Sequence, residues 1–193
     1  MVNLIQKKEK NELWEWIKVI GIAAIFVMVM RFFIFSPVMV DGASMMPTFE
    51  DGDKVIVNKI GPRLADYKRF DVVVFEVAEN KHYIKRIIGF PGDHIAYKDD
   101  VLYINGEVYE EPYLTSFKEA LIDTGDFTYD FILEEQLGEM TVPQGHFFVL
   151  GDNRRKSIDS RDPQVGFIAQ ETILGTADFV IWPFQKLGGI KDK

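Results

Sequence analysis

The feature that most constrains this chain is an apolar stretch near its N-terminus, WIKVIGIAAIFVMVMRFFIF, which runs from Trp16 to Phe35. As an α-helix, its 20 residues would extend about 30 Å, which is the thickness of the hydrocarbon core of a bilayer. Its two charged residues, Lys18 and Arg31, stand near the ends, where long side chains can reach the lipid headgroups. The stretch therefore predicts a transmembrane helix over residues 16–35.

A cleavable signal peptide or a buried helix is the alternative, because the uninterrupted apolar run Val19–Met30 is short. A cleavable signal needs small residues at fixed offsets just after the apolar run. Here Ser36 is followed by Pro37, which disfavours cleavage at that point, and Val40, Asp41 and Gly42 match only weakly. We therefore favour an anchor that is not removed.

The basic residues around the apolar stretch predict its orientation. Those that precede the uninterrupted run are Lys7, Lys8, Lys10 and Lys18. After Arg31 the next one is Lys54. By the positive-inside rule, residues 1–15 lie in the cytoplasm and residues 36–193 lie outside the cell membrane. This second part is long enough to bury a core of its own.

Composition excludes several classes of protein. The chain has 193 residues and no cysteine, so disulfides, cysteine-ligated zinc, iron–sulfur clusters and thiol nucleophiles are excluded. A net charge of −8 argues against nucleic acid as a partner. The three histidines, His82, His94 and His146, match no metal-ligand spacing, and we expect neither a metal nor a cofactor.

After Pro37 the apolar runs shorten and become rich in β-branched and aromatic residues. The predicted strands are Lys54–Lys59, Asp71–Val77, His82–Phe90, Val101–Ile104, His146–Leu150 and Ile173–Trp182. Asn105-Gly106 predicts a hairpin turn, and Ser116–Leu121 predicts a short helix. Tyr109–Thr141 is irregular and acidic, and indicates an insertion. The lack of long alternating helices favours antiparallel sheets.

One unusual segment is GASMMPT, in which Ser44 stands between glycine and a proline-containing turn. Ser44 follows Phe35 by nine residues, and nine extended residues reach only about 30 Å, so this serine stays near the bilayer surface. On its own the segment is weak evidence, because most serines in loops form hydrogen bonds within turns.

A second unusual residue is Lys85, within the apolar strand YIKRIIG. Side chains of a strand alternate between its faces, so Lys85 shares a face with Tyr83 and Ile87, whereas Arg86 points to the other face. At a pKa near 10.4, only about one amine in 2,500 is neutral at pH 7. Burial lowers the pKa of an amine, as a general base requires. The simpler interpretation is that Lys85 has no catalytic role and extends its charged end into solvent from a strand at the sheet edge.

Several segments together resemble the bacterial type I signal peptidases, membrane-anchored endopeptidases with a serine–lysine dyad. Besides the N-terminal anchor, they are SMMPT (Ser44–Thr48), RFDVVVF (Arg69–Phe75), YIKRIIGFPGD (Tyr83–Asp93), NGEVYEEPYL (Asn105–Leu114), GDNRRKSIDSR (Gly151–Arg161) and FVIWPF (Phe179–Phe184). The resemblance implies a mainly β fold with two antiparallel sheets and an inserted, variable subdomain at about 97–143. It also implies the substrate, namely signal peptides of exported preproteins.

The resemblance assigns roles to residues at the matching positions. Ser44 would be the nucleophile and Lys85 the general base. Ser157 would orient Lys85, Asp159 and Arg161 would support that loop, and Asp152 would pair with Arg86. We expect acyl transfer through an acyl-enzyme, in a monomer bound to the lipid bilayer.

Two details around the serine are less defined. The backbone N–H of Ser44 is the expected oxyanion donor, but the second donor is unknown because Gly42 has no side-chain hydroxyl. Ala43 also departs from the glycine or aspartate expected there. Candidates to line an apolar substrate cleft are Met39, Met45 and Met46.

Two other functions compete with this interpretation. A self-cleaving, repressor-like peptidase shares the dyad and the β core, but such proteins are soluble and lack the N-terminal anchor. A non-catalytic anchored β module would bind exported chains or envelope partners. It would have no reason to keep both Ser44 and Lys85, and it would not react with an acylating inhibitor.

Overall fold

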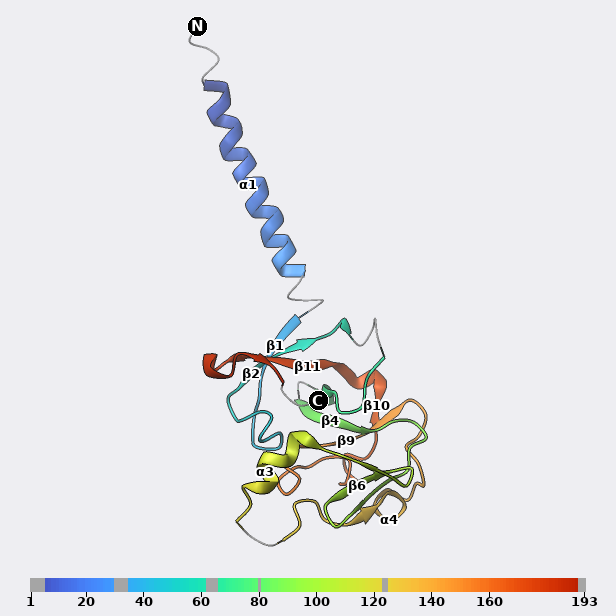
Figure 1. Ribbon diagram of the computed structural model, residues 1–193. Helices are drawn as coiled ribbons and strands as arrows, with labels where there is room; N and C mark the ends of the chain where they lie inside the picture. Colours follow the sequence, from blue (N-terminus) through green and yellow to red (C-terminus); the bar gives the residue numbers. More distant parts are fainter. Residues whose placement is uncertain (1–5, 30–34, 62–65, 80, 123–124, 191–193) are drawn as a thin grey trace. The chain divides into compact units, whose positions relative to one another are not determined.

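The computed structural model describes residues 6–29, 35–61, 66–79, 81–122 and 125–190 (Figure 1). The chain divides into two compact units, Met1–Ser36 and Pro37–Lys193, which we describe separately. The first contains a helix and the second is mainly β.

Helix α1 (Gln6–Val29) is the element of the first unit. Among the described residues, we find no helix that combines the length and the apolar composition needed to cross a bilayer. The predicted helix over residues 16–35 is wrong at its C-terminal end, because Phe35 belongs to strand β1 (Phe35–Met39), which lies beside another strand. Residues 30–34 lie outside the described part of the chain.

A large antiparallel sheet forms most of the second unit. Its strand order is β1, β2 (Lys54–Asn58), β11 (Ile173–Trp182), β3 (Val72–Ala78), β4 (Lys81–Gly89), β9 (His146–Leu150) and β10 (Ile168–Ala169), with β12 (Gly188–Gly189) paired to β11. Pro37 is tolerated in β1 because this strand lies at the sheet edge, where a missing N–H costs no ladder bond. The expectation of a mainly β chain with antiparallel sheets is confirmed.

A smaller sheet lies within the region expected to be inserted. Its strand order is β7 (Glu107–Tyr109), β6 (Val101–Ile104), β5 (Ile95–Lys98) and β8 (Phe131–Ile132). Asn105 and Gly106 join β6 to β7 with φ angles of 54° and 82°, as a type I′ hairpin turn requires.

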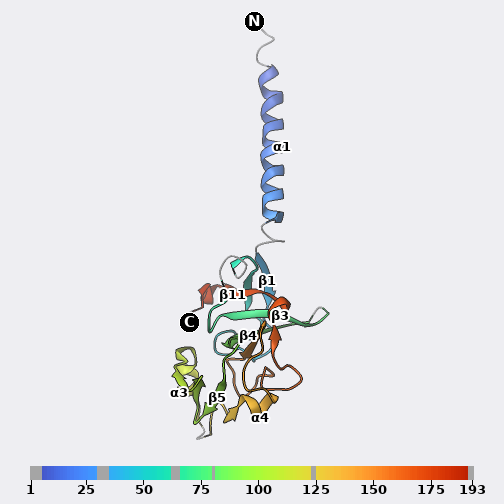
Figure 2. The ribbon, with the colours of Figure 1, turned by 90° about the vertical axis from the view of Figure 1, so that its right-hand side faces the viewer.

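Short helices complete the second unit. They are η2 (Pro112–Leu114), α3 (Thr115–Glu119), α4 (Leu133–Leu137), η3 (Gln170–Thr172) and η4 (Phe184–Lys186). Two views at right angles show the small sheet with α3 and α4 at one end of this unit, and β1 and β11 at its other end (Figures 1 and 2).

Strand β4 is buried on both faces over its second half, where it runs between β3 and β9. Ile84 packs into one core cluster, Ile87 into a second and Ile88 into a third. Each such side chain contributes about 1.5–3 kcal/mol when fully buried. The two charged residues between them, Lys85 and Arg86, are therefore forced into the interior, on opposite faces of the strand.

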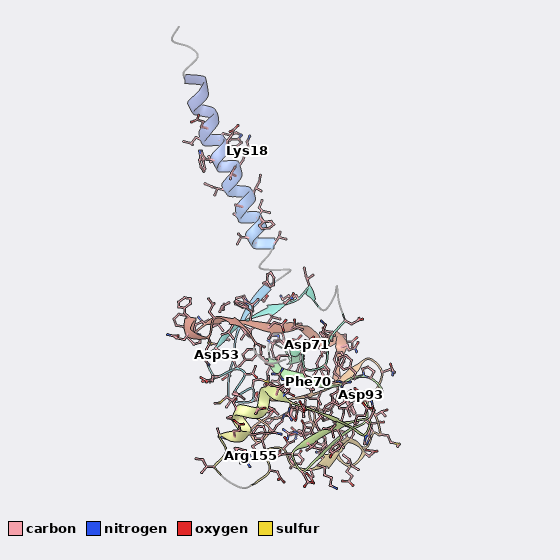
Figure 3. All side chains as sticks on the ribbon, in the orientation of Figure 1. Lys18, Asp53, Phe70, Asp71, Asp93 and Arg155 are labelled. Atoms are coloured by element: carbon pink, nitrogen blue, oxygen red, sulfur yellow. The ribbon has the colours of Figure 1, made fainter. Side chains whose placement is uncertain are left out.

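The segment before β3 crosses the middle of this unit, where Phe70 and Asp71 lie (Figure 3). Phe70 has a φ of 69°, in the left-handed region that a bulky residue rarely adopts. In this conformation its N–H donates to the carbonyl of Ile87, and its carbonyl accepts a hydrogen bond from Arg86. The turn thus helps to hold Arg86 in place.

Candidate active site

Ser44 and Lys85 lie side by side in the structure. Ser44 stands in the turn that follows β1, and Lys85 in the middle of β4. Lys85 Nζ donates to Ser44 Oγ over 2.9 Å and to the carbonyl of Ile84 over 3.0 Å. Nζ also lies 5.1 Å from the centre of the Tyr83 ring, on the face predicted for both side chains. The fold thus joins an amine and a hydroxyl that are 41 residues apart.

The interior changes the acidity of the lysine. Lys85 is only 3% exposed, and burial lowers its pKa from 10.5 to about 8, although the negative charges of Asp159 and Asp152 act in the opposite direction. With this pKa, about one amine in ten is neutral at pH 7. The amine is therefore close to the range in which a general base works.

The backbone around Ser44 is held by a second loop. The N–H of Asn153 donates to the carbonyl of Ser44, and its side-chain amide donates to the carbonyl of Ala43, each over 3.0 Å. The N–H of Gly42 is occupied by the carboxylate of Asp51 at 2.8 Å. Among the described residues, the N–H of Ser44 has no acceptor, so it is free to stabilise an oxyanion.

Gly151 allows this loop to approach the serine. A Cβ at this position would lie 2.2 Å from Ser157 Oγ and 2.5 Å from the carbonyl oxygen of Ser44, which is closer than real atoms pack. Its N–H donates to Asp159 Oδ2 over 3.0 Å. The glycine therefore sets the distance between the two segments.

The expected hydrogen bond from Ser157 to Lys85 is absent. Lys85 uses Ser44 and Ile84 as acceptors instead, and the buried Ser157 Oγ has no partner among the described residues. The hydroxyl is near enough to Asp159 to contribute to the lowered pKa of that carboxyl, but it lies outside hydrogen-bonding geometry. Ser157 thus adjoins the serine–lysine pair without orienting the amine.

Arg86 forms a buried two-point ion pair on the other face of β4. Its Nε and Nη2 lie 2.8 and 2.6 Å from the two oxygens of Asp152, and both side chains are fully buried. Thr48, from the turn that holds the serine, donates to the same carboxylate and accepts from Arg86. The guanidinium lies 3.8 Å from the centre of the Tyr113 ring. This pair joins β4, the serine turn and the following loop.

Asp159 and Arg161 form a second buried pair in the same loop. Arg161 donates to both carboxylate oxygens, over 2.8 and 2.9 Å. Burial raises the pKa of Asp159, but Arg161 and the N–H of Gly151 outweigh it, and the net pKa of the carboxyl is lowered. Asp159 is therefore an anion that acts on Lys85 and raises its pKa.

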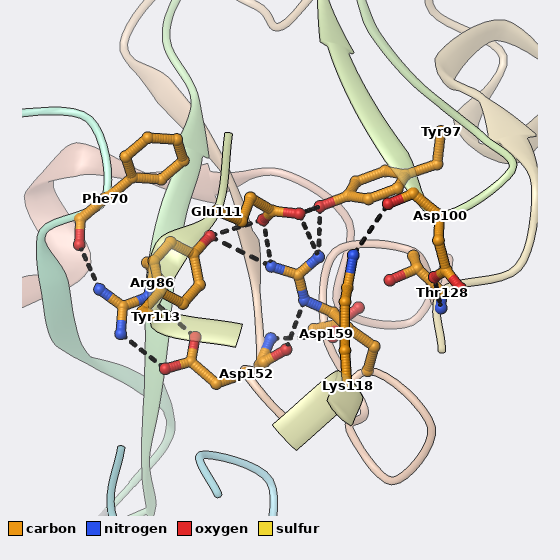
Figure 4. A network of polar contacts seen from close by, with 12 residues as sticks. Phe70, Arg86, Tyr97, Asp100, Glu111, Tyr113, Lys118, Thr128, Asp152 and Asp159 are labelled. Carbon is orange, nitrogen blue, oxygen red and sulfur yellow. Dashed lines mark hydrogen bonds and ion pairs between the residues drawn. The ribbon is translucent and has the colours of Figure 1, made fainter. Parts of the chain in front are cut away.

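A third polar cluster was not expected from the sequence (Figure 4). Arg154 is buried and donates to Glu111, to the hydroxyls of Tyr97 and Tyr113, and to the carbonyl of Gly151. Both tyrosine hydroxyls donate to Glu111 over 2.6 Å. The cluster ties the small sheet to the loop beside the serine. Glu111 and Tyr113 belong to the segment EEPYL, which matches the family in sequence. This match could have drawn attention to them, but the resemblance assigned them no role.

A cavity of about 280 Å³ opens beside the serine–lysine pair. Its walls come from the end of β1, the turn that follows it, and β4, with Lys156 and Ile158 opposite. Of the three methionines expected at a substrate cleft, Met39 and Met45 line this cavity and Met46 does not.

Other hollows are larger, but lack the serine and the lysine. One of about 440 Å³ lies on the small sheet around Phe131, with none of the expected site residues in its lining. Volume alone therefore does not mark the reactive position here. Within the described ranges, no group of three or more His, Cys, Asp or Glu residues is placed to bind a metal ion.

Comparison with known proteins identifies the family. The profile of the family "Signal peptidase, peptidase S26" matches residues 13–182. A signal peptidase I of Bacillus caldolyticus is 46% identical over 181 residues, which are 94% of this chain and 96% of the relative. Signal peptidase I T of Bacillus subtilis (strain 168) is 43% identical over 183 residues, 94% of this chain and 91% of the relative.

A solved structure agrees with these relatives. The crystal structure of a signal peptidase I from Enterococcus faecalis V583 is 43% identical, with a TM-score of 0.54. It covers 58% of this chain and 97% of its own. From its matching sequence and antiparallel β fold, the chain belongs to the S26 family of signal peptidases, as a bacterial type I signal peptidase and a serine peptidase.

Proposed function

We propose that this chain removes N-terminal signal peptides from exported preproteins, with Ser44 as nucleophile and Lys85 as general base. The observation that carries the proposal is the 2.9 Å contact between Ser44 Oγ and the buried Nζ of Lys85. The names of the relatives support the reaction. The substrate class is taken from that resemblance.

The reaction begins with the neutral form of Lys85, in which the lone pair of Nζ accepts the hydroxyl proton of Ser44. The serine oxygen bonds to the scissile carbonyl carbon, and the N–H of Ser44 stabilises the resulting oxyanion. The tetrahedral intermediate collapses, the lysine returns its proton to the departing amine, and the acyl-enzyme remains. Lys85 then takes a proton from water, whose oxygen attacks the ester carbonyl. As the bond to Ser44 breaks, Lys85 gives this proton to the serine oxygen, and the signal peptide leaves with a free carboxylate.

The remaining groups act through this pair. Asp152 and Arg86 hold the serine turn against β4, and Asp159 with Arg161 holds the following loop. Each carboxylate is paired with an arginine, and although both still act to raise the pKa of Lys85, burial of the amine outweighs them. The cavity lined by Met39 and Met45 would bind the small residues that precede the scissile bond. Met46 is not part of its lining.

The pH dependence of cleavage tests the role of Lys85. Lowering the pH protonates the amine, so kcat/KM should rise with pH up to about 8 and level off above that value. Well below pH 8, each further decrease of one pH unit should lower kcat/KM about tenfold. The measurement is the initial rate of cleavage of a preprotein between pH 5 and 9, with N-terminal sequencing of the product. A flat profile contradicts an amine base.

We further propose that the apolar stretch that begins at Trp16 anchors a monomer in the cell membrane and ends before strand β1, with residues 1–15 in the cytoplasm and 36–193 outside. Large apolar side chains of α1 support this, since Ile17, Ile20 and Phe26 are all more than half exposed. Carbonate extraction of membranes is the test. The full chain should stay in the membrane pellet, and residues 36–193 alone should not. Release of the full chain would contradict the anchor.

A further inference from the structure

A second cavity, of about 600 Å³, adjoins the one that contains the serine and lysine. The two share Ile158, which is 58% exposed and forms the wall between them. The second cavity is lined on one side by the loop residues Arg154–Asp159, without Lys156, and on another by Asp126, Phe127 and Tyr129. A peptide chain that crosses Ile158 would therefore occupy both cavities.

Two residues of this lining, Arg161 and Ser157, each have a buried polar atom without a partner among the described residues. Arg161 is 4% exposed, and its Nη1 has no hydrogen-bond partner, while its Nε and Nη2 are used by Asp159 and by the carbonyl of Arg154. Ser157 Oγ, also in the lining, is buried without a partner as well. A buried donor without an acceptor is costly, so these atoms indicate a ligand that supplies one.

The charges around the donor define the kind of acceptor. Asp159 already neutralises Arg161 through two short contacts. The other charged residues of the lining, Asp126 and Asp162 against Arg154 and Arg155, balance one another, so the lining has no net charge to attract an ionic ligand. A neutral acceptor, such as the carbonyl of a peptide bond, matches both the free N–H and the surrounding charge.

The linings of the two cavities differ in polarity, as the two halves of a substrate do. The cavity beside Ser44 has Val38, Met39 and Ile84 in its walls, which suits the apolar, small-residue end of a signal peptide. The second cavity is lined largely by polar and charged residues, which suits a chain that continues into a water-soluble protein. We propose that the second cavity binds the first residues of the mature protein, with Arg161 Nη1 donating to a backbone carbonyl. This rests on the proposed function.

A third cavity, of about 500 Å³, also reaches Ile158 and offers a competing path. It is lined by β3 and β4 residues that include Glu76 and Tyr83. None of the unpartnered buried side-chain atoms among the described residues belongs to its lining. The donors therefore favour the path along Arg161, and an experiment can separate the two paths.

The test compares charge reversals in the two cavities. Asp126→Lys changes the second cavity, and Glu76→Lys is the matched change in the third; both side chains are exposed. The full-length enzyme in detergent is given signal-peptide substrates that carry Lys or Glu at the second to fourth positions after the cut. The ratio of kcat/KM for the Lys substrate to kcat/KM for the Glu substrate should fall about fivefold or more in Asp126→Lys. The introduced ammonium group repels a substrate Lys and attracts a substrate Glu, and the effect is modest because exposed charges interact weakly. Glu76→Lys should leave the ratio unchanged.

Substrate length gives a second readout. Shortening the peptide from five residues after the cut to one should lower kcat/KM of the wild-type enzyme about tenfold or more, since the hydrogen bond to a charged donor is lost. An unchanged ratio in Asp126→Lys, a changed ratio in Glu76→Lys, or no effect of length overturns the inference. Failure to cleave any of the peptides would instead contradict the proposed function.

Discussion

Replacing Lys85 by methionine is expected to lower kcat/KM for preprotein cleavage about a thousandfold or more, because the buried amine that takes the serine proton is lost. Methionine has a similar length and no charge, so it can fill the same space between Tyr83 and Ser44. Ser44→Ala should have at least as large an effect, since no atom remains to form the acyl-enzyme. The measurement is the single-turnover rate with a purified preprotein.

The same variant is not expected to unfold. Burial lowers the pKa of Lys85 from 10.5 to about 8, so between these values the unfolded chain binds more protons than the folded chain. Stability from this group therefore rises with pH through that window, and at pH 7 the buried lysine destabilises the fold. Lys85→Met should keep or raise the midpoint of urea unfolding.

Lys81→Met is the matched control, because Lys81 stands on the same strand and over the same Tyr83 ring but is exposed. Cleavage by this variant should be nearly normal. Near-normal cleavage by Lys85→Met would instead rule out Lys85 as the base.

Replacing Asp152 by alanine is expected to lower the free energy of unfolding by about 3–5 kcal/mol, because Arg86 would be left as a buried, unpaired cation. Both side chains of the pair are fully buried, and the carboxylate also accepts from Thr48. Loss of the pair should also reduce cleavage, since Thr48 belongs to the turn that holds Ser44. Urea unfolding followed by tryptophan fluorescence gives the free energy.

An ion cluster with one exposed carboxylate, Glu50, provides the comparison. Lys186 lies 3.0 Å from Glu50 and 3.1 Å from Asp53, with its side chain 34% exposed. Glu50→Ala should lower the free energy of unfolding by no more than about 1 kcal/mol, because this side chain is 55% exposed. The double change Asp152→Leu with Arg86→Met should recover much of the stability that Asp152→Ala loses. A small loss in Asp152→Ala, or no recovery in the double variant, would contradict this account of the pair.

The strands were predictable because their patterns are local. His146–Leu150 and Ile173–Trp182 were predicted with the bounds that the structure has. The hairpin at Asn105-Gly106 was predictable for the same reason, since few residues tolerate two successive positive φ angles. The very short strands β8, β10 and β12 carry too few residues for any pattern.

The errors occur where distant segments decide the outcome. Phe35 continues an apolar run in the sequence, yet it starts an edge strand because β2 is available beside it. Ser157 was expected to bond with Lys85, but the amine donates to Ser44 and Ile84 instead. The cluster of Arg154 with Glu111 joins residues 43 positions apart, and no local pattern reveals such a pairing.

The sequence by itself determined the β-rich composition, the strand positions, the family and the residue types around Ser44 and Lys85, because these depend on neighbouring residues or on matched segments. Only the tertiary structure decided the acidity of Lys85, the partners of Arg86 and Arg154, and the unpartnered Nη1 of Arg161. Each of these depends on burial and on distances between segments that are far apart in the chain, and both arise only when the sheets pack together.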